Sequence, residues 1–339
     1  ILIYKIKLGE VMKYTENALN VLTAKTFKGI GNAWINQNIV GTLSYEIIVE
    51  RLKEKTKEDI TDDIFLERRE DINRQILKLE NSCDGIVAIG DKNFPYLRGN
   101  IKSSDKPVVL FYKGDISLLD KNSFNIAVIG VLNPDPDTEI DERKVVSSLV
   151  AEGATIVSGL AFGCDSIAHD ETLNSNGATV AVLPSPLNNI LPSRNYELAV
   201  KIVENQGLLI TEYYTEPENV MALSSRYIAR DRLQALFSDT VLLSASYAPD
   251  SIDPNNPKPD SGSRHAMEKA KEYGLKRAVI YNSKYIGNPK YDLNRRIINS
   301  DKNVIVVDPL SISKGISEIV NQENDGIIIF SDSEQGSLF

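Results

Sequence analysis

The sequence predicts an α/β protein with a doubly wound parallel sheet and a helical domain before it. Between about residues 124 and 282, short apolar runs alternate with longer stretches of helical periodicity. Strands that are buried on both faces and joined by helical crossovers form parallel sheets, and such crossovers are right-handed. Before this region, apolar residues recur at i, i+3, i+4 spacing beside dense mixed charge, which indicates surface helices.

The N-terminal segment, residues 12–81, is predicted to be helical. Between its first two helices, Gly29-Ile30-Gly31 admits two interpretations. It can form the tight turn of a helix-hairpin-helix or SAM-like domain, with backbone N–H groups that face a phosphate. It can also be a plain helix–helix turn with Trp34 in the core, and a single copy of the pattern favours this second interpretation. The helices are predicted at Tyr14–Ala24, Ser44–Lys57 and Asp62–Leu79.

A bridging segment, residues 82–123, precedes a Rossmann-like sheet domain at residues 124–282. Two strands are predicted in the bridging segment, at Gly85–Ile89 and Pro107–Tyr112. The strands of the sheet domain are predicted at Asn125–Gly130, Thr155–Ser158, Thr179–Leu183, Leu208–Thr211, Thr240–Ser244 and Arg277–Tyr281. The helices between them are predicted at Glu139–Glu152, Ser166–Asn176, Arg194–Asn205, Ala222–Phe237 and Ser263–Tyr273.

The last segment, residues 283–339, is predicted to be an α/β extension. Strands are expected at Val304–Val307 and Gly326–Phe330, around a helix at Ser311–Asn321, and the polar end after residue 330 is expected to fray. Within the sheet domain, Ala248–Asp260 is rich in Pro, Asp and Asn, which is typical of a mobile loop.

The composition indicates a cytoplasmic protein without membrane contact. No apolar run is long enough to cross a bilayer, and the apolar and basic first eleven residues are too short for a cleaved signal peptide. The two cysteines, Cys83 and Cys164, are expected to be reduced. The net charge of −9 argues against a surface coated in basic residues for nucleic acid, although a local basic groove is compatible with it.

The sharpest feature of the sequence is the turn from the second sheet strand into its helix. Ser158, Gly159 and Gly163 are small residues that let a backbone approach an anion, and a helix N-terminus adds free N–H groups. Asp165 is expected to be the N-cap of this helix, and His169, four residues later, shares its face and is expected to pair with it. A structural role for His169 is favoured over a catalytic one.

Arginines and a second small-residue turn lie near the ends of other strands. Arg226 and Arg230 share one helical face, whereas Arg232 points elsewhere. They can clamp a phosphate, or they can form a solvated face paired with Asp231 and Asp239; three arginines within seven residues favour the clamp. Another helix is also preceded by small residues, Ser261, Gly262 and Ser263, with the basic residue Arg264 directly after them. The first strand of the sheet ends in a glycine, Gly130.

The sequence offers anion recognition rather than evident catalysis. No nucleophile–base–orienter set is visible, and His169 and His265 are the only histidines. The ligands of a zinc site, a Walker lysine loop and a Gly-x-Gly-x-x-Gly turn are all missing, so no metal, nicotinamide or flavin is expected. We therefore predict no catalytic residue and no cofactor.

In order and spacing, these motifs resemble those of the DprA/Smf DNA-processing family. Ser158-Gly159-Leu160-Ala161-Phe162-Gly163-Cys164-Asp165 with Ala168-His169 resembles the family's Ser-Gly-x-Ala-x-Gly-Ile-Asp…Ala-His signature. Arg230-Asp231-Arg232 with Ser238 resembles its Arg-Asn-Arg…Ser. Further similar runs lie at Phe94–Leu97, Leu110–Gly114, Ile126–Gly130, Gly177–Leu183, Leu191–Asn195, Gly207–Glu212 and Ser261–Ser263. The resemblance spans about residues 94–282, and the preceding helices fit the family's N-terminal domain more loosely.

The chain departs from the family pattern at several site positions. Val131-Leu132 stand where the family has Ser-Arg, and Asp231 stands where it has Asn. An acidic residue usual near the end of the fifth strand is replaced around Ser244–Ser246, and Ala248–Asp260 looks inserted. Arg264-His265 replace apolar positions. These departures indicate a divergent branch.

The resemblance implies single-stranded DNA binding in a positively charged pocket at the strand ends. It also implies homodimers that hand DNA to the RecA recombinase during transformation or recombination. Bases are expected to stack on Phe162 or Tyr227. The residues expected to hold the DNA are Gly130, Ser158, Gly159, Phe162, Gly163, Asp165, Arg226, Arg230, Arg232, Ser261, Gly262, Ser263 and Arg264.

Two other functions stay open from the sequence. The first is a small-nucleotide sensor or nucleosidase, as in the wider Rossmann-like superfamily, with Asp165, Glu212 or Asp231 near the sugar. Leu132 stands where the family has an arginine, and this absence, together with the negative net charge, favours the small-nucleotide function. The breadth of the motif match favours DNA binding. The second is a module that restrains a partner protein, such as an antitoxin-type regulator in phage defence.

Overall fold

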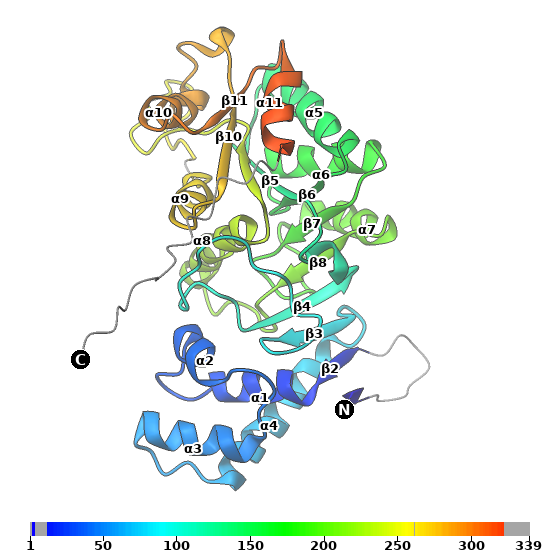
Figure 1. Cartoon of the computed structure of the whole chain (residues 1–339), viewed down its shortest axis with the longest axis vertical. Helices are drawn as coiled ribbons and strands as arrows, with labels where there is room; N and C mark the ends of the chain where they lie inside the picture. The colour runs from blue at the N-terminus through cyan, green and yellow to red at the C-terminus, as the bar shows by residue number, and fades with distance from the viewer. Residues whose placement is uncertain (1, 4–11, 261, 322–339) are drawn as a thin grey trace, which may run out of the picture.

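The computed structural model describes residues 2–3, 12–260 and 262–321. Within these residues, eleven strands form one sheet in the order β1-β2-β3-β4-β8-β7-β6-β5-β9-β10-β11 (Figure 1). The strands β5 to β11 are all parallel to one another, which confirms the predicted α/β class with a doubly wound parallel sheet. Their bounds are Asn125–Ile129 (β5), Thr155–Ser158 (β6), Thr179–Val182 (β7), Leu208–Thr211 (β8), Thr240–Leu243 (β9), Lys276–Ile280 (β10) and Ile305–Val307 (β11).

The strand order reverses next to β5. From β5 the chain moves to β6, β7 and β8 on one side, and then returns to place β9, β10 and β11 on the other side. In open α/β sheets, such a switch point leaves a crevice outside the carboxyl ends of the strands, and ligands bind there. The space beyond the ends of β5 and β9 is therefore where the fold favours a site.

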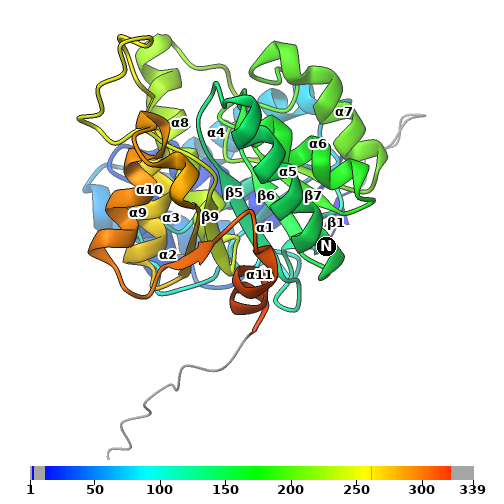
Figure 2. The ribbon, with the colours of Figure 1, turned by 90° about the horizontal axis from the view of Figure 1, so that it is seen from above.

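Successive residues of the buried strands face opposite layers of helices. Ile126 and Val128 belong to the core on one face of the sheet, whereas Ala127 and Ile129 belong to the core on the other face. Figure 2 shows α5 and α6 on one side of the strands and α9 and α10 on the other. The helices are α5 (Pro136–Ala151), α6 (Cys164–Asn174), α7 (Tyr196–Glu204), α8 (Val220–Leu236), α9 (Arg264–Glu272), α10 (Asp292–Ser300) and α11 (Ile312–Val320).

The N-terminal part packs α1 (Glu16–Lys25), α2 (Asn32–Asn38), α3 (Tyr45–Thr56) and α4 (Asp62–Ile76) at one end of the sheet (Figure 1). The first predicted helix begins two residues late, because residues 13–15 form β2 (Lys13–Thr15), which pairs with β3. The Thr15 hydroxyl caps α1 by accepting from the Ala18 N–H at 2.9 Å. Leu2–Ile3 form β1, which is antiparallel to β2.

The glycine pair between α1 and α2 forms a helix–helix turn. Gly29 has a φ of +79°, and Gly31 is the N-cap of α2. Trp34 is partly buried and packs against the N-terminal core, as the interpretation as a plain turn expects. A phosphate contact at this turn stays a prediction.

The bridging strands extend the parallel sheet with an antiparallel edge. β4 (Val109–Gly114) pairs antiparallel with both β8 and β3 (Gly85–Ala88). One hydrogen-bonded sheet therefore runs through every expected segment, and the domain boundaries after residues 81, 123 and 282 stay predictions. The expected strand at Gly326–Phe330 and the polar end after it lie outside the described residues.

The Pro-rich segment Ala248–Asp260 holds only an isolated bridge between Asp253 and Asn256. The Tyr247 hydroxyl donates to Asp253 Oδ2 at 2.7 Å, and the Ser251 hydroxyl donates to Asp292 Oδ2 at 2.5 Å. The segment is irregular, as predicted, and these contacts fix its path from β9 to α9.

Candidate functional site

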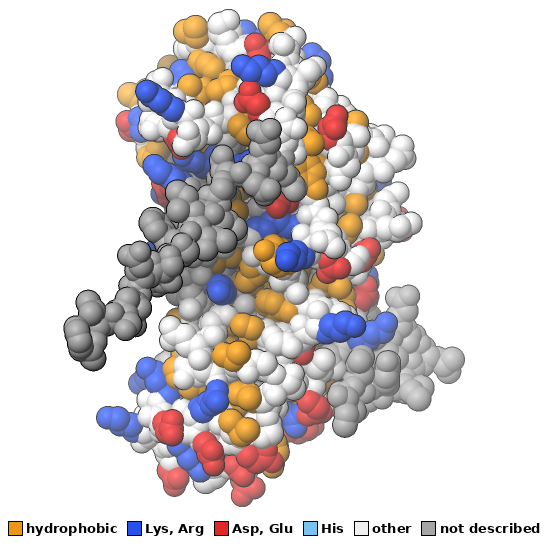
Figure 3. Space-filling view, viewed as in Figure 1, with side chains coloured by type: hydrophobic (Ala, Val, Ile, Leu, Met, Phe, Trp, Pro, Cys, Tyr) orange, Lys and Arg blue, Asp and Glu red, His pale blue; other side chains and the backbone are white. Residues whose placement is uncertain are grey.

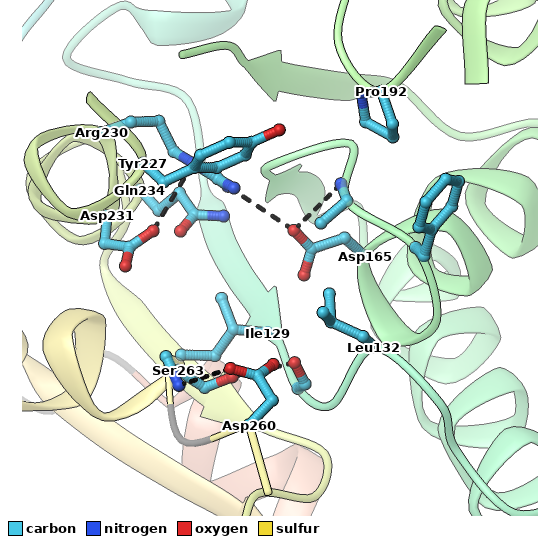
Figure 4. Close-up of a pocket in the computed structure, with 14 residues that line it drawn as sticks. Ile129, Leu132, Asp165, Pro192, Tyr227, Arg230, Asp231, Gln234, Asp260 and Ser263 are labelled. Atoms are coloured by element: carbon cyan, nitrogen blue, oxygen red, sulfur yellow. Dashed lines mark hydrogen bonds and ion pairs between the residues drawn. The ribbon is translucent and has the colours of Figure 1, made fainter. Parts of the chain in front are cut away.

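A cavity of about 390 Å³ lies at the switch point of the sheet, a size that suits a small organic ligand. Its walls come from the end of β5, the β6–α6 turn, α8 and the segment before α9 (Figure 4). The lining residues are Ile129, Gly130, Leu132, Ala161, Phe162, Asp165, Pro192, Tyr227, Arg230, Asp231, Gln234, Asp260, Gly262 and Ser263. We call this cavity the switch-point pocket.

Arg230 is the cation of the switch-point pocket. Its side chain is almost fully buried, and its Nη1 lies 3.5 Å from Asp165 Oδ2 while its Nε lies 3.5 Å from Asp231 Oδ1 (Figure 4). The Arg230 Cζ lies 5.7 Å from the centroid of the Tyr227 ring. With the Gln234 amide turned to satisfy its neighbours, Gln234 Oε1 accepts from Arg230 Nη1 at 2.9 Å.

Gly159 is a glycine because Arg230 lies across it. A Cβ at this position would lie 1.1 Å from Arg230 Nη1, so any larger residue displaces the guanidinium. The neighbouring Ser158 is fully buried, and its hydroxyl donates to the Val128 carbonyl at 2.7 Å. Both residues thus shape the wall of the pocket from behind.

Asp165 holds the β6–α6 turn together. The expectation that it caps α6 is wrong, because Gly163 is the N-cap and the helix begins at Cys164. Asp165 Oδ2 instead accepts from the backbone N–H of Gly159 at 3.1 Å and of Ala161 at 3.4 Å. Burial raises the pKa of Asp165, and the positive charge of Arg230 opposes this rise.

The glycines at the strand ends serve close packing. Gly163 has a φ of +71°, and a Cβ there would lie 2.3 Å from the Val131 carbonyl oxygen. A Cβ on Gly130 would lie 2.5 Å from Cys164 Sγ. Both positions need glycine so that the ends of β5 and β6 can approach each other.

The other two predicted arginines lie outside the switch-point pocket. Arg226 donates to the Thr215 carbonyl at 2.7 Å, and its Cζ lies 4.2 Å from the centroid of the Tyr213 ring. Arg232 Nη2 donates to both carboxylate oxygens of Glu212, at 2.7 Å each. The structure therefore does not bring the three arginines together.

The small-residue turn before α9 contributes to the rim of the pocket. The Ser263 hydroxyl donates to the Gly130 carbonyl at 2.9 Å, which joins this turn to the end of β5. The Gly262 N–H donates to Asp260 Oδ1 at 3.0 Å. Arg264 begins α9 and is not part of the lining. Ser261 lies outside the described residues.

His169 is a structural residue below the pocket. The expected pair with Asp165 is wrong, because His169 Nδ1 hydrogen-bonds to the Thr179 hydroxyl at 2.7 Å. That hydroxyl donates to the Ile156 carbonyl, so the His169 Nδ1 carries the proton and donates to it. Burial lowers the pKa of His169 to about 3, and the ring is neutral at physiological pH.

The sequence analysis did not identify two polar residues that line the switch-point pocket. Gln234 lies four residues after Arg230, so helical periodicity alone places it on the same face of α8. Asp260 precedes the predicted Ser261–Ser263 turn, but nothing local indicates that it reaches β5.

Burial and the nearby Asp165 and Asp260 raise the pKa of Asp231 to about 7, although Arg230 opposes the rise.

The face of the molecule drawn in Figure 3 is not broadly basic. On the face shown in Figure 3, Lys and Arg side chains are interspersed with Asp and Glu rather than gathered into one continuous patch. This distribution agrees with the net charge of −9. No described helix is both long and apolar enough to span a bilayer.

The fold and the pocket define the class of protein. It is a Rossmann-like α/β protein with a ligand-sized pocket at the topological switch point of its sheet. Within this class, the chain belongs to the family of DNA recombination-mediator protein A, whose model matches residues 85–299. The predicted DprA/Smf membership is thereby confirmed.

Several characterised proteins are similar in sequence. The chain is 35% identical to protein Smf of Escherichia coli over 143 residues, which are 42% of this chain and 37% of that protein. It is 28% identical to protein Smf of Synechocystis over 276 residues, or 81% and 62% of the two chains. It is 30% identical to the DNA processing protein DprA of Streptococcus pneumoniae over 246 residues, or 70% and 79%. The chain spans less than two thirds of the two Smf proteins.

Two solved structures share the fold. DprA of Streptococcus pneumoniae aligns with a TM-score of 0.64 at 22% identity and covers 86% of this chain and 95% of its own. DprA of Helicobacter pylori, whose structure describes its single-stranded DNA binding mode, aligns with a TM-score of 0.54 at 24% identity, covering 69% of this chain and 95% of its own.

Proposed function

We propose that this protein is a DNA-processing protein that binds single-stranded DNA, with the switch-point pocket as the place where the strand enters. The observation that carries the proposal is this pocket at the strand ends of a chain that belongs to the family of DNA recombination-mediator protein A. In this proposal the protein acts in DNA uptake or recombination. A homodimer that passes the strand to RecA belongs to the same proposal.

The aromatic lining supports contact with bases. Phe162 is 41% exposed although it lines the pocket, and Tyr227 is partly buried across from it on α8. Bases stack on such exposed rings with little dependence on sequence. Apolar Ile129, Leu132 and Pro192 complete walls that favour a flat ring over a hydrated ion.

The phosphate contacts that we propose are narrower than the set suggested by the sequence. Gly262 and Ser263, at the rim of the pocket, are retained as candidate phosphate contacts, whereas Arg230, inside the pocket, is retained as a candidate contact to the base. Ser158, Arg226 and Arg232 donate to atoms of the protein itself, and we assign them structural roles.

The test is the affinity of a fluorescently labelled single-stranded oligonucleotide, measured by anisotropy across a salt series. Phe162→Ala should weaken binding about tenfold or more, because a stacked base contributes about 1–3 kcal/mol. Tyr96→Ala is the matched control, since the Tyr96 side chain is also exposed, at 43%. Its backbone N–H donates to the Leu119 carbonyl, which places it near the amino ends of the strands, away from the pocket. The control should bind like the wild type, and the affinity should fall as salt rises. Absence of binding at low salt would overturn the proposal.

A second candidate function is the sensing of a small nucleotide, and one observation favours it. The pocket is lined by Asp165, Asp231 and Asp260, carboxyl groups that could bind the hydroxyl groups of a sugar. A single saturable ligand with weak salt dependence in calorimetry, together with no oligonucleotide binding, would select this candidate.

A further inference from the structure

Part of the β6–α6 turn, where a phosphate could bind backbone N–H groups, is already occupied by the protein's own carboxylate. Asp165 Oδ2 accepts from the N–H groups of Gly159 and Ala161, and the Cys164 N–H donates to the Val131 carbonyl at 3.1 Å. These are N–H groups that a phosphate would need at such a turn. At Gly159 and Ala161, the β6–α6 turn therefore presents a carboxylate to the pocket in place of free N–H donors.

The charges in the lining also oppose an anion. Among the described lining residues, three are aspartates and one, Arg230, is an arginine. Arg230 is already within 3.5 Å of both Asp165 and Asp231. The high pKa of Asp231 has the same origin, since Asp165 and Asp260 add to the effect of burial. An incoming phosphate would meet an excess of negative charge.

The pocket instead suits a flat ligand that donates hydrogen bonds. Phe162, Tyr227 and Leu132 supply apolar surface for a ring, while the aspartates supply acceptors around it (Figure 4). A metal ion does not fit, because no group of three Asp, Glu, His or Cys side chains in the described part of the chain is arranged to hold one.

We propose that the switch-point pocket takes a nucleobase with an exocyclic amino group, such as cytosine, whose N–H donors bind Asp231 or Asp260, and that it rejects thymine and the DNA backbone. This inference rests on the proposed function, since the base is taken to belong to single-stranded DNA. Thymine has a single donor at its pairing edge, N3–H, which lies between two carbonyl oxygens, so a carboxylate that accepted from it would be repelled by an oxygen on each side. The exocyclic amino group of cytosine has two N–H donors and an acceptor on one side only. A free nucleoside has the same chemistry, and the test separates the two sources.

The test compares two labelled oligonucleotides of equal length, one made only of deoxycytidine and one made only of thymidine. At one salt concentration and at about pH 8.5, where Asp231 is ionised, the deoxycytidine oligonucleotide should bind about tenfold more tightly, because a hydrogen bond to a charged acceptor is worth about 1.5–3 kcal/mol. In the Asp231→Asn, Asp260→Asn variant this ratio should fall toward one, since an amide can donate to thymine as well as accept from cytosine.

The matched control removes two carboxylates elsewhere. Asp63→Asn with Glu67→Gln changes two exposed residues of α4, far from the pocket, and should keep the tenfold ratio. If the double pocket variant does not fold by circular dichroism, Asp260→Asn alone is measured, because Asp260 lies in an irregular segment. Its ratio should also fall.

The outcomes separate the inference from the proposed function. Equal affinity for both oligonucleotides, or a tenfold ratio that survives in the pocket variants, overturns the inference and leaves DNA binding intact. Binding of free deoxycytidine but not thymidine in calorimetry, without binding of either oligonucleotide, supports the recognition chemistry and overturns the proposed function. No binding of any of these ligands overturns both.

Discussion

Two faces of α8 show how differently one helix can use the same residue type. On the face toward the switch-point pocket, Arg230 meets Asp165 and Asp231 through single contacts of 3.5 Å. On the face toward the bridging segment, Arg232 binds both oxygens of Glu212 at 2.7 Å and donates to the Asp105 carbonyl at 2.9 Å.

The comparison separates an arginine whose hydrogen bonds are satisfied within the protein from an arginine that can still bind a ligand. The ion pair of Arg232 has short contacts and little solvent, so it fixes α8 against the end of β8 and the β3–β4 connection. The contacts of Arg230 are long, so its guanidinium can form shorter and better aligned hydrogen bonds when a ligand binds in the pocket. Arg232 is therefore a structural residue, whereas Arg230 is available for recognition.

The largest effect should come from Arg232. Arg232→Met should lower the free energy of unfolding by about 3–5 kcal/mol, because it leaves Glu212 buried without its partner. Urea denaturation measures this change. Adding Glu212→Leu should recover most of the stability, since an apolar pair replaces the ion pair. A single variant as stable as the wild type would mean that the two faces of α8 do not differ as described.

A smaller effect should follow from Gly159→Ala, which tests the pocket face. The new methyl group takes the place of Arg230 Nη1, so the guanidinium must leave Asp165, at a cost of about 2–3 kcal/mol. Oligonucleotide binding should weaken as well. Gly31→Ala is the control, because no atom lies within 4 Å of the added carbon. In a protein that already carries Arg230→Ala, Gly159→Ala should lower the free energy of unfolding by little more. If the two losses of stability add in full, the close approach of residue 159 to Arg230 is contradicted.

The smallest expected effect concerns the pH dependence of stability at Asp231. Its folded pKa of about 7 lies above the ordinary aspartate pKa of 3.8, so between these two pH values the folded state binds a proton that the unfolded state does not. The contribution of Asp231 to the free energy of unfolding therefore falls as pH rises through this window and is constant above it. Asp231→Asn should remove this fall, so that the variant gains on the order of 1–2 kcal/mol relative to the wild type between about pH 6 and pH 7.5. Parallel stability profiles for the two proteins would exclude the raised pKa.

Much of the fold was predictable because the signals are local. Val128 and Ile129 stand in a run of apolar residues that predicts a buried strand, and Ile64, Ile72 and Ile76 recur at helical spacing in what the structure shows as α4. The position of the pocket also followed, since Ser158–Asp165 lies where a strand turns into a helix in a parallel sheet. These features depend on neighbours within a few residues.

The sequence by itself determined the strands and crossover helices of the parallel sheet and the small-residue turn at Gly159, but not α2, α10, β1 or β2. Only the tertiary structure decided that Arg230 enters the pocket while Arg232 turns to Glu212, and that Asp260 arrives from a distant loop. It also decided that Asp165 binds back to its own turn and that His169 pairs with Thr179. The physical reason is that strand and helix periodicity arises from local backbone geometry. The partner of a buried charge, in contrast, depends on which distant segments the sheet brings within a few ångströms.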